Sequence, residues 1–155
     1  MPIIEPFNFK KLIIKDKRAL GLDLGSKTIG LAISDSRLVV SSPITTIRRK
    51  KFTADAEILI NLINERMVGG LVLGLPKNMD GSEGPRAQST RQFAQNLLEK
   101  INIPISFWDE RLSSAEVERV LINEIDMTRR RRKQVIDKMA AGVILQGFLD
   151  YMQHN

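Results

Sequence analysis

Residues 19–35 read ALGLDLGSKTIGLAISD, and this stretch decides which folds the chain can adopt. The apolar run 20–24 is typical of a strand covered on both faces, and residues 29–34 repeat the pattern after a polar turn, which predicts a β-hairpin. One acid, Asp23, interrupts the first strand, and Gly25 behind it lets another group approach the backbone closely. An ionised carboxylate at such a position needs a metal, a cation or hydrogen bonds, unless Asp23 merely caps the turn.

The chain of 155 residues has the length of one ordinary domain. Its 24 lysines and arginines exceed its 18 acids and leave a net charge of +6. Such an excess attracts nucleic acid or an anionic membrane surface, and a solvated basic surface also accounts for it. Charge alone therefore suggests a polyanionic partner without choosing one.

The chain contains no cysteine, which excludes disulfides, thiolate zinc sites and cysteine nucleophiles and suits a reducing cytoplasm. The only histidine is His154, so neither a Ser-His-Asp triad nor a multi-histidine metal site is expected. No apolar stretch approaches the roughly 20 residues that span a bilayer. We therefore predict a cytoplasmic protein without a membrane partner, in which any metal is held by oxygen atoms.

The order of predicted elements is three strands, a helix, a strand, a helix, a strand and two helices. This order combines an antiparallel hairpin with parallel crossovers, which predicts an α/β protein with a mixed sheet flanked by helices. Residues 1–17 precede the first clear strand and are interpreted as an N-terminal extension, and residues 18–155 as one domain. Beyond the hairpin, strands are expected at residues 41–47, 71–75 and 103–108, and helices at residues 54–67, from residue 85, at 113–124 and at 130–152.

Acids at two other places accompany Asp23. Asp109 and Glu110 follow the predicted strand 103–108, at the edge where open α/β sheets bind ligands, and alternation lets only one of them face the side of Asp23. The sequence does not say which. Asp137 shares a helix face with small residues three and four positions later, which predicts that it faces the sheet. The candidate catalytic residues are Asp23, Asp109, Glu110 and Asp137.

Carboxylates that cluster repel one another unless a cation neutralises them, and Mg²⁺ and Mn²⁺ prefer oxygen ligands. Two such ions can clamp a phosphodiester, because one activates water and the other stabilises the leaving oxygen without histidine or cysteine. This chemistry predicts a phosphodiester-cleaving hydrolase with Mg²⁺ or Mn²⁺ as its cofactor. The predicted metal ligands are Asp23, Glu110 and Asp137.

Basic residues accompany the acids along the chain. A run of five at 129–133 opens the last predicted helix within about two turns of Asp137, and a helix N-terminus favours phosphate. Each cation, taken alone, is as consistent with a solvated surface as with phosphate binding. The predicted nucleic-acid-binding residues are Lys27, Arg86, Arg91, Arg111, Arg129, Arg130, Arg131, Arg132 and Lys133.

Four stretches, in order, resemble the motifs of the YqgF family, also called RuvX, whose members are similar to Holliday junction resolvases. They are residues 21–35, GLPKNMDGSEGPRA at 74–87, DERLSS at 109–114 and DKMAA at 137–141. The resemblance covers about residues 18–151. The chain departs from the family at Gly142, where a larger residue is usual, and in the extension 1–17. Neither departure touches the predicted acids.

The resemblance implies an RNase H-like fold with a five-stranded mixed sheet and helices on both faces. It also implies a divalent metal, a structured nucleic acid as substrate, and an active site that uses Asp23, either Asp109 or Glu110, and Asp137. The leading hypothesis is a nuclease, specifically a metal-dependent endonuclease, that matures the 5′ end of pre-16S rRNA during ribosome biogenesis.

Three alternatives stay open at this point. In the first, the protein is a resolvase that cuts Holliday junctions in branched DNA. In the second, it is a nucleic-acid-binding or ribosome-associated factor without catalytic activity. The stretch 22–28 also resembles the first phosphate loop of actin-like ATPases and sugar kinases, but that architecture needs two such domains around a nucleotide. The sequence does not fix the number of metal ions or the oligomeric state, for which a homodimer is considered.

Overall fold

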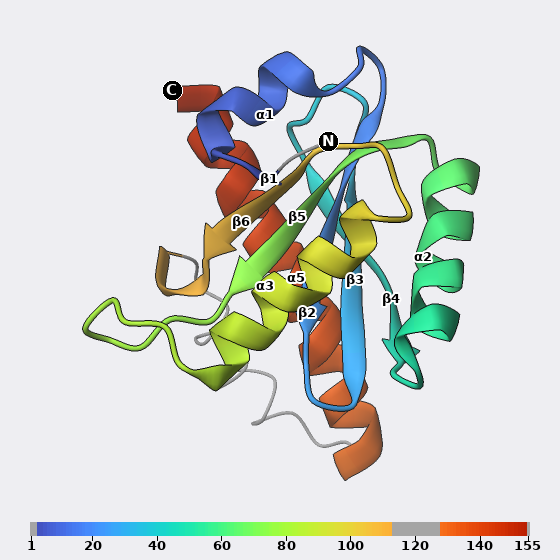
Figure 1. The fold of residues 1–155 in the computed structure, drawn as a ribbon, viewed down its shortest axis with the longest axis vertical. Coiled ribbons are helices and arrows are strands. Elements are labelled where there is room, and N and C mark those ends of the chain that lie inside the picture. Colours follow the sequence, from blue (N-terminus) through green and yellow to red (C-terminus); the bar gives the residue numbers. More distant parts are fainter. Residues whose placement is uncertain (1–2, 113–127, 155) are drawn as a thin grey trace.

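In the computed structural model, residues 3–112 and 128–154 are described, apart from the side chains of residues 130, 133 and 134. A six-stranded sheet forms the centre of the molecule, in the order β1-β6-β5-β2-β3-β4 (Figure 1). The pairs β2–β3 and β3–β4 are antiparallel, and the other pairs are parallel. The strands are β1 (Ile3–Ile4), β2 (Arg18–Leu24), β3 (Thr28–Ser34), β4 (Ser41–Arg48), β5 (Val68–Leu75) and β6 (Ile105–Asp109).

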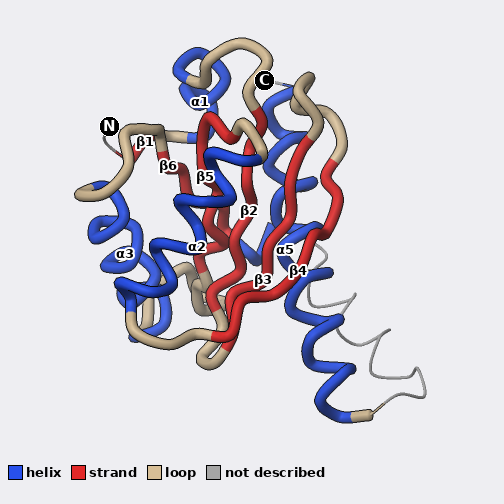
Figure 2. The backbone as a smooth tube through the Cα atoms, turned by 90° about the vertical axis from the view of Figure 1, so that its right-hand side faces the viewer, coloured by secondary structure: helices blue, strands red, loops and turns tan. Residues whose placement is uncertain are grey.

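Helices cover both faces of the sheet. α2 and α3 lie on one face and α5 crosses the other, and the first turns of α5 extend beyond the end of the sheet (Figure 2). α1 packs against the later part of α5, where the rings of Phe9 and Phe148 meet edge to face at 5.0 Å. The helices are α1 (Pro6–Leu12), α2 (Phe52–Glu65), α3 (Pro85–Leu98) and α5 (Arg129–His154), and a 3₁₀ turn, Glu110–Leu112, follows β6.

The predicted mixed α/β sheet with an antiparallel hairpin is confirmed. It has six strands rather than the expected five, because Ile3 and Ile4 of the N-terminal segment add a short strand to the edge of β6. The Ser106 hydroxyl fixes this edge by donating a hydrogen bond to the Ile4 carbonyl at 2.9 Å. The helix expected at residues 113–124 lies outside the described residues, and the division of the chain at residue 17 stays a prediction.

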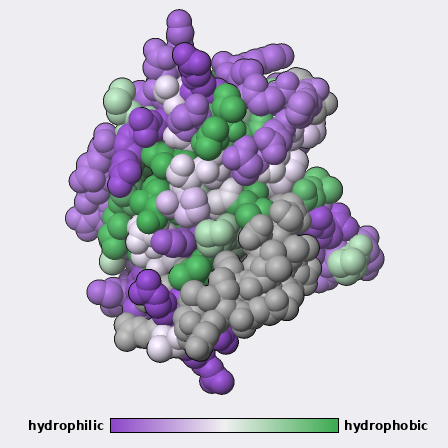
Figure 3. Space-filling view, turned by 180° about the vertical axis from the view of Figure 1, so that it is seen from behind, coloured by the Kyte–Doolittle hydropathy of each residue, from purple (hydrophilic) through white to green (hydrophobic). Residues whose placement is uncertain are grey.

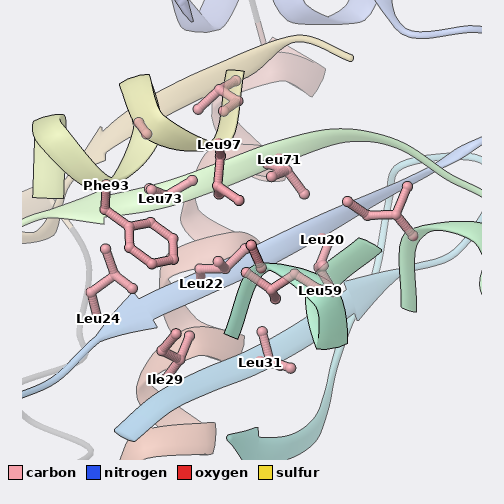
Figure 4. Close-up of a cluster of buried hydrophobic side chains, with 14 of the residues drawn as sticks. Leu20, Leu22, Leu24, Ile29, Leu31, Leu59, Leu71, Leu73, Phe93 and Leu97 are labelled. Atoms are coloured by element: carbon pink, nitrogen blue, oxygen red, sulfur yellow. The ribbon is translucent and has the colours of Figure 1, made fainter. Parts of the chain in front are cut away.

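Alternation along the central strands creates one hydrophobic core on each face of the sheet. Leu20, Leu22 and Leu24 of β2 point toward α2 and α3, where they share a core with Phe93 (Figure 4). Because neighbouring residues in a strand point to opposite faces, Asp23 points toward α5. The second core lies on that face and includes Phe9, Ala32, Val72, Trp108, Ala141, Ile144, Leu145 and Phe148.

The outer surface on the α5 side is mixed in character. Figure 3 shows this side from behind, with hydrophilic side chains along the edges and hydrophobic ones in separate groups between them. Within the described part of the chain, no helix is both long and apolar enough to cross a membrane.

Candidate active site

Asp23 lies near the C-terminal end of β2 and is only 4% exposed. The strand is buried on both sides of it, as the apolar run around this acid predicts. Burial of a carboxylate costs free energy unless its charge is compensated by hydrogen bonds or a cation. The side chain points to the face that α5 covers.

Asp137 of α5 packs against β3 at the level of Asp23. Gly30 of β3 is the direct partner of Asp23, and a Cβ atom on Gly30 would overlap the backbone carbonyl of Asp137. The Thr28 hydroxyl, two residues earlier on the same face, donates a hydrogen bond to the Asp137 carboxylate. The absence of a side chain at Gly30 therefore lets α5 bring its acid against the strand beside Asp23.

Glu110, in the turn after β6, lies against β5, the strand on the other side of β2. Leu22 pairs with Leu73 of β5, so Gly74 lies at the level of Asp23. A Cβ atom on Gly74 would lie 2.8 Å from Oε1 of Glu110 and 2.6 Å from Cδ1 of Ile144. Glu110 thus folds back over β5 on the α5 side, the side toward which Asp23 points.

Asp109, one residue earlier, has different surroundings. It accepts a hydrogen bond from the Arg111 guanidinium at 2.8 Å and another from the Arg111 backbone N–H at 2.9 Å. The hydrogen bond from the Arg111 side chain holds the pKa of the Asp109 carboxyl below its usual value. Its charge is therefore already compensated within the protein.

Two of the predicted basic residues, Lys27 and Arg86, lie around the turn that follows Asp23. Lys27 is exposed in the β2–β3 turn, and Arg86 at the start of α3 reaches the Leu24 carbonyl at 3.5 Å. Arg49, which the sequence analysis did not single out, donates to the Gly25 carbonyl at 2.6 Å. The sequence signal that could have indicated Arg49 is the run of four basic residues at 48–51, which directly precedes α2.

Arg91 and Arg111 lie at the other side of the site, and each has an acidic partner. Arg91 binds Glu83 at 2.6 Å and stacks over the Phe107 ring at 4.9 Å. Arg111 binds Asp109 and also donates to the Met79 carbonyl at 3.2 Å. These ion pairs leave less positive charge for a phosphate than the sequence alone suggests.

The basic run 129–133 begins α5, as expected. Arg129 is exposed and Arg132 is half-buried. Arg131 lines a hollow of about 180 Å³ between α5 and β4, together with Thr46 and Lys138. The side chains of Arg130 and Lys133 lie outside the described residues.

The chain matches the model of a protein family along most of its length. That family is described as "RuvX: Holliday junction resolvase", and the match spans residues 17–151. The chain belongs to the RuvX family. This confirms the resemblance that its four motifs indicate.

Relatives from two bacteria are similar to this RuvX chain over nearly its whole length. The one from Paramagnetospirillum magneticum is 56% identical over 150 residues, covering 97% of this chain and 96% of the relative. The one from Paracoccus denitrificans is 57% identical over 145 residues, covering 94% and 91%. Both are named "Putative pre-16S rRNA nuclease". The prediction of a phosphodiester-cleaving hydrolase is confirmed at the level of the family.

The fold also has a counterpart among solved structures. Thermus thermophilus RuvC in complex with a Holliday junction substrate is similar to this RuvX chain with a TM-score of 0.54. The two share 9% sequence identity, and the match covers 88% of this chain and 96% of RuvC. This likeness confirms the RNase H-like fold.

The chemistry of the site suits a hard divalent cation. RNase H-like nucleases generally use such a metal, and the acids of this RuvX chain on the α5 side offer only oxygen donors. Among the described residues, no three acidic side chains are already arranged around one point as ligands. The argument that a divalent cation fits this site therefore rests on the oxygen donors and on the elements that supply them: one acid comes from β2, one from the turn after β6 and one from α5.

Proposed function

We propose that this protein is a metal-dependent endonuclease that matures the 5′ end of pre-16S rRNA. The observation that carries the proposal is the placement of Glu110 and Asp137 against Gly74 and Gly30, on the two strands that flank Asp23. Relatives that are more than half identical to the chain carry the name "Putative pre-16S rRNA nuclease". Precursor rRNA as the substrate is also consistent with the expected cytoplasmic location.

In this proposal Asp23, Glu110 and Asp137 hold Mg²⁺ or Mn²⁺. When bound, such a cation supplies charge neutralisation at the phosphate and makes water a better nucleophile. Asp109 is not a ligand in this assignment, because Arg111 already engages its carboxylate. Of the two acids between which the sequence does not choose, we therefore propose Glu110 as the ligand.

The remaining residues of the site position these acids and the substrate. Thr28 orients the Asp137 carboxylate through its hydroxyl. Lys27 and Arg129 are exposed, and we assign them to the phosphate backbone of the substrate. Contacts of this kind fix the position of a nucleic acid without reading its bases, so we propose recognition of a structured RNA by its shape.

Cleavage of branched DNA is the second candidate, because the family model carries the description of a Holliday junction resolvase. Resolving a four-way junction requires cuts in two strands, so this candidate also predicts a homodimer with two active sites. Light scattering gives the oligomeric state, and cleavage of a four-way junction beside a precursor rRNA fragment ranks the two substrates.

The decisive experiment compares Asp23→Asn with a matched control, Asp16→Asn. Both changes remove one carboxylate, but Asp16 is exposed in the turn before β2, where its φ of 66° also suits asparagine. We expect Asp23→Asn to lower metal-dependent cleavage of precursor rRNA about 100-fold or more, and Asp16→Asn to cleave like the unaltered protein. All three proteins are purified in parallel, so that a contaminating host nuclease appears equally in each.

Two outcomes would contradict the proposal. Equal cleavage by Asp23→Asn and the unaltered protein, with the fold intact by circular dichroism, would show that Asp23 is not in the active site. Tight RNA binding by the unaltered protein without cleavage at any Mg²⁺ or Mn²⁺ concentration would instead favour the non-catalytic factor.

A further inference from the structure

A second site lies on the other side of the strand that carries Asp23. A cavity of about 530 Å³ opens between the β2–β3 turn, the β4–α2 turn and the start of α3. It is lined by Leu24, which belongs to the core facing α2 and α3, so it lies on the sheet face opposite to α5. We name it the Arg49 pocket, and its polar lining consists of Ser26, Arg49, Lys50, Arg86, Ser89 and Thr90.

The charge of the Arg49 pocket is entirely positive. Its lining includes two guanidinium groups and one ammonium group, and none of the described residues that line it is acidic. Within the described chain, neither Arg49 nor Arg86 forms an ion pair, whereas Arg91 and Arg111 both do. Neighbouring cations repel one another, and a bound anion relieves this repulsion.

Both arginines reach the backbone that follows Asp23. Arg49 donates to the Gly25 carbonyl and Arg86 to the Leu24 carbonyl, and the Arg49 guanidinium also lies 5.7 Å from the centre of the Phe93 ring. A guanidinium has five N–H donors, so one bond to a carbonyl leaves others for a phosphate. The pocket therefore presents fixed donors and hydroxyl groups, which is the chemistry that binds phosphate oxygens.

We infer that the Arg49 pocket binds a phosphate of the nucleic-acid backbone, away from the bond that is cut. This inference rests on the proposed nuclease function, because it assigns the pocket to the same substrate. The turn at residues 25–27 separates the pocket from the acids on the α5 side. A strand that crosses this turn contacts the acids with one part of its backbone and the pocket with another.

The test compares the double variant Lys50→Gln/Arg86→Gln with Lys100→Gln. Lys50 and Arg86 are exposed, and among the described residues the Arg86 side chain forms one long hydrogen bond, to the Leu24 carbonyl at 3.5 Å, so the fold should survive their loss. Lys100 is an exposed lysine beyond the far end of α3. All changes are made in the Asp23→Asn protein without divalent metal, so that binding of a precursor rRNA fragment is measured without cleavage.

We expect the double variant to bind the fragment about tenfold more weakly and to depend less steeply on salt. Each lost phosphate contact should reduce the slope of log K against log salt by about one unit, while Lys100→Gln leaves the slope nearly unchanged. Inorganic phosphate as a competitor provides a second comparison, since it should displace RNA from the Asp23→Asn protein more readily than from the double variant.

The inference is overturned if the double variant, with an unchanged melting temperature, binds RNA with the affinity and salt slope of Lys100→Gln. Failure of the nuclease function has a different signature. A protein that binds RNA through the pocket but never cleaves it would refute the proposed activity, while the salt slopes would still support the pocket.

Discussion

The arginines at two ends of the site have opposite surroundings. At the turn after β2, the hydrogen bonds that the Arg49 and Arg86 side chains form with described residues go only to backbone carbonyls. At the end of β6, Arg111 binds Asp109, and nearby Arg91 binds Glu83. We call these regions the hairpin end and the β6 end. All four residues look alike in the sequence, yet only those at the hairpin end keep their charge available for a ligand.

The two acids of one dipeptide also differ in their surroundings. Asp109 is neutralised by Arg111, whereas Glu110 folds over Gly74 toward the row that holds Asp23. The surroundings of a charged residue near the site thus indicate whether it is held in an ion pair within the protein or faces the proposed metal site. The comparison predicts which residues tolerate substitution and which do not.

The largest expected effect separates Glu110 from Asp109. Glu110→Gln should lower metal-dependent cleavage about 100-fold, because it removes one charged oxygen donor from the proposed metal site. Asp109→Asn should change the rate by less than about threefold, because it alters an ion pair at the surface. Single-turnover cleavage at saturating metal measures both. Equal losses in the two variants would remove the distinction between these two acids.

The next effect tests how α5 reaches the hairpin end. In Gly30→Ala, the added methyl group must displace the Asp137 backbone, which should destabilise the fold by about 1–3 kcal/mol and reduce cleavage as well. Gly84→Ala is the matched control, since its Cβ would meet Asn78 at an ordinary distance of 3.7 Å. Urea unfolding monitored by Trp108 fluorescence compares the two. A fully stable Gly30→Ala protein would contradict the close approach of α5.

The smallest effect concerns the pH dependence of the β6 end. Arg111 lowers the pKa of Asp109, so this carboxylate stabilises the folded state above its unfolded pKa near 3.8, and the contribution is lost as pH falls through the lower folded pKa. The difference in melting temperature between the unaltered protein and Arg111→Gln should therefore be constant from about pH 5 to 7 and shrink below about pH 4.

Arg37→Gln, a change at an exposed arginine in the β3–β4 turn, controls for the general effect of charge on acid unfolding. Its difference from the unaltered protein should vary less with pH over the same range. If Arg111→Gln and Arg37→Gln follow the same curve, the Asp109–Arg111 pair does not contribute to stability.

Much of the fold could be predicted because its signals are local. The hairpin was expected at residues 20–24 and 29–34 and occurs as Arg18–Leu24 and Thr28–Ser34. The last helix was expected at 130–152 and occurs as Arg129–His154. Strand β1 escaped prediction because two isoleucines are too few to show the alternation of a strand. Their pairing with β6 depends on residues 105 and 106, which are far from them in the sequence.

The site could be predicted only in part, for a similar reason. Alternation restricts one of Asp109 and Glu110 to the side of Asp23, but Phe107 and Trp108 before them are both aromatic and do not reveal which face α5 covers. Ion-pair partners such as Glu83 for Arg91 depend on loop geometry. Gly30 and Gly74 were a usable signal, since glycine inside a strand often marks a close approach.

Strand β1 also has a consequence for how molecules of this protein behave toward one another. An open sheet edge presents unpaired N–H and C=O groups on which a strand of another chain can grow. Ile3 and Ile4 occupy that edge of β6, and a strand of two residues is too short to act as a good template itself. Removal of residues 1–5 should therefore promote aggregation through β6, even where catalysis is preserved.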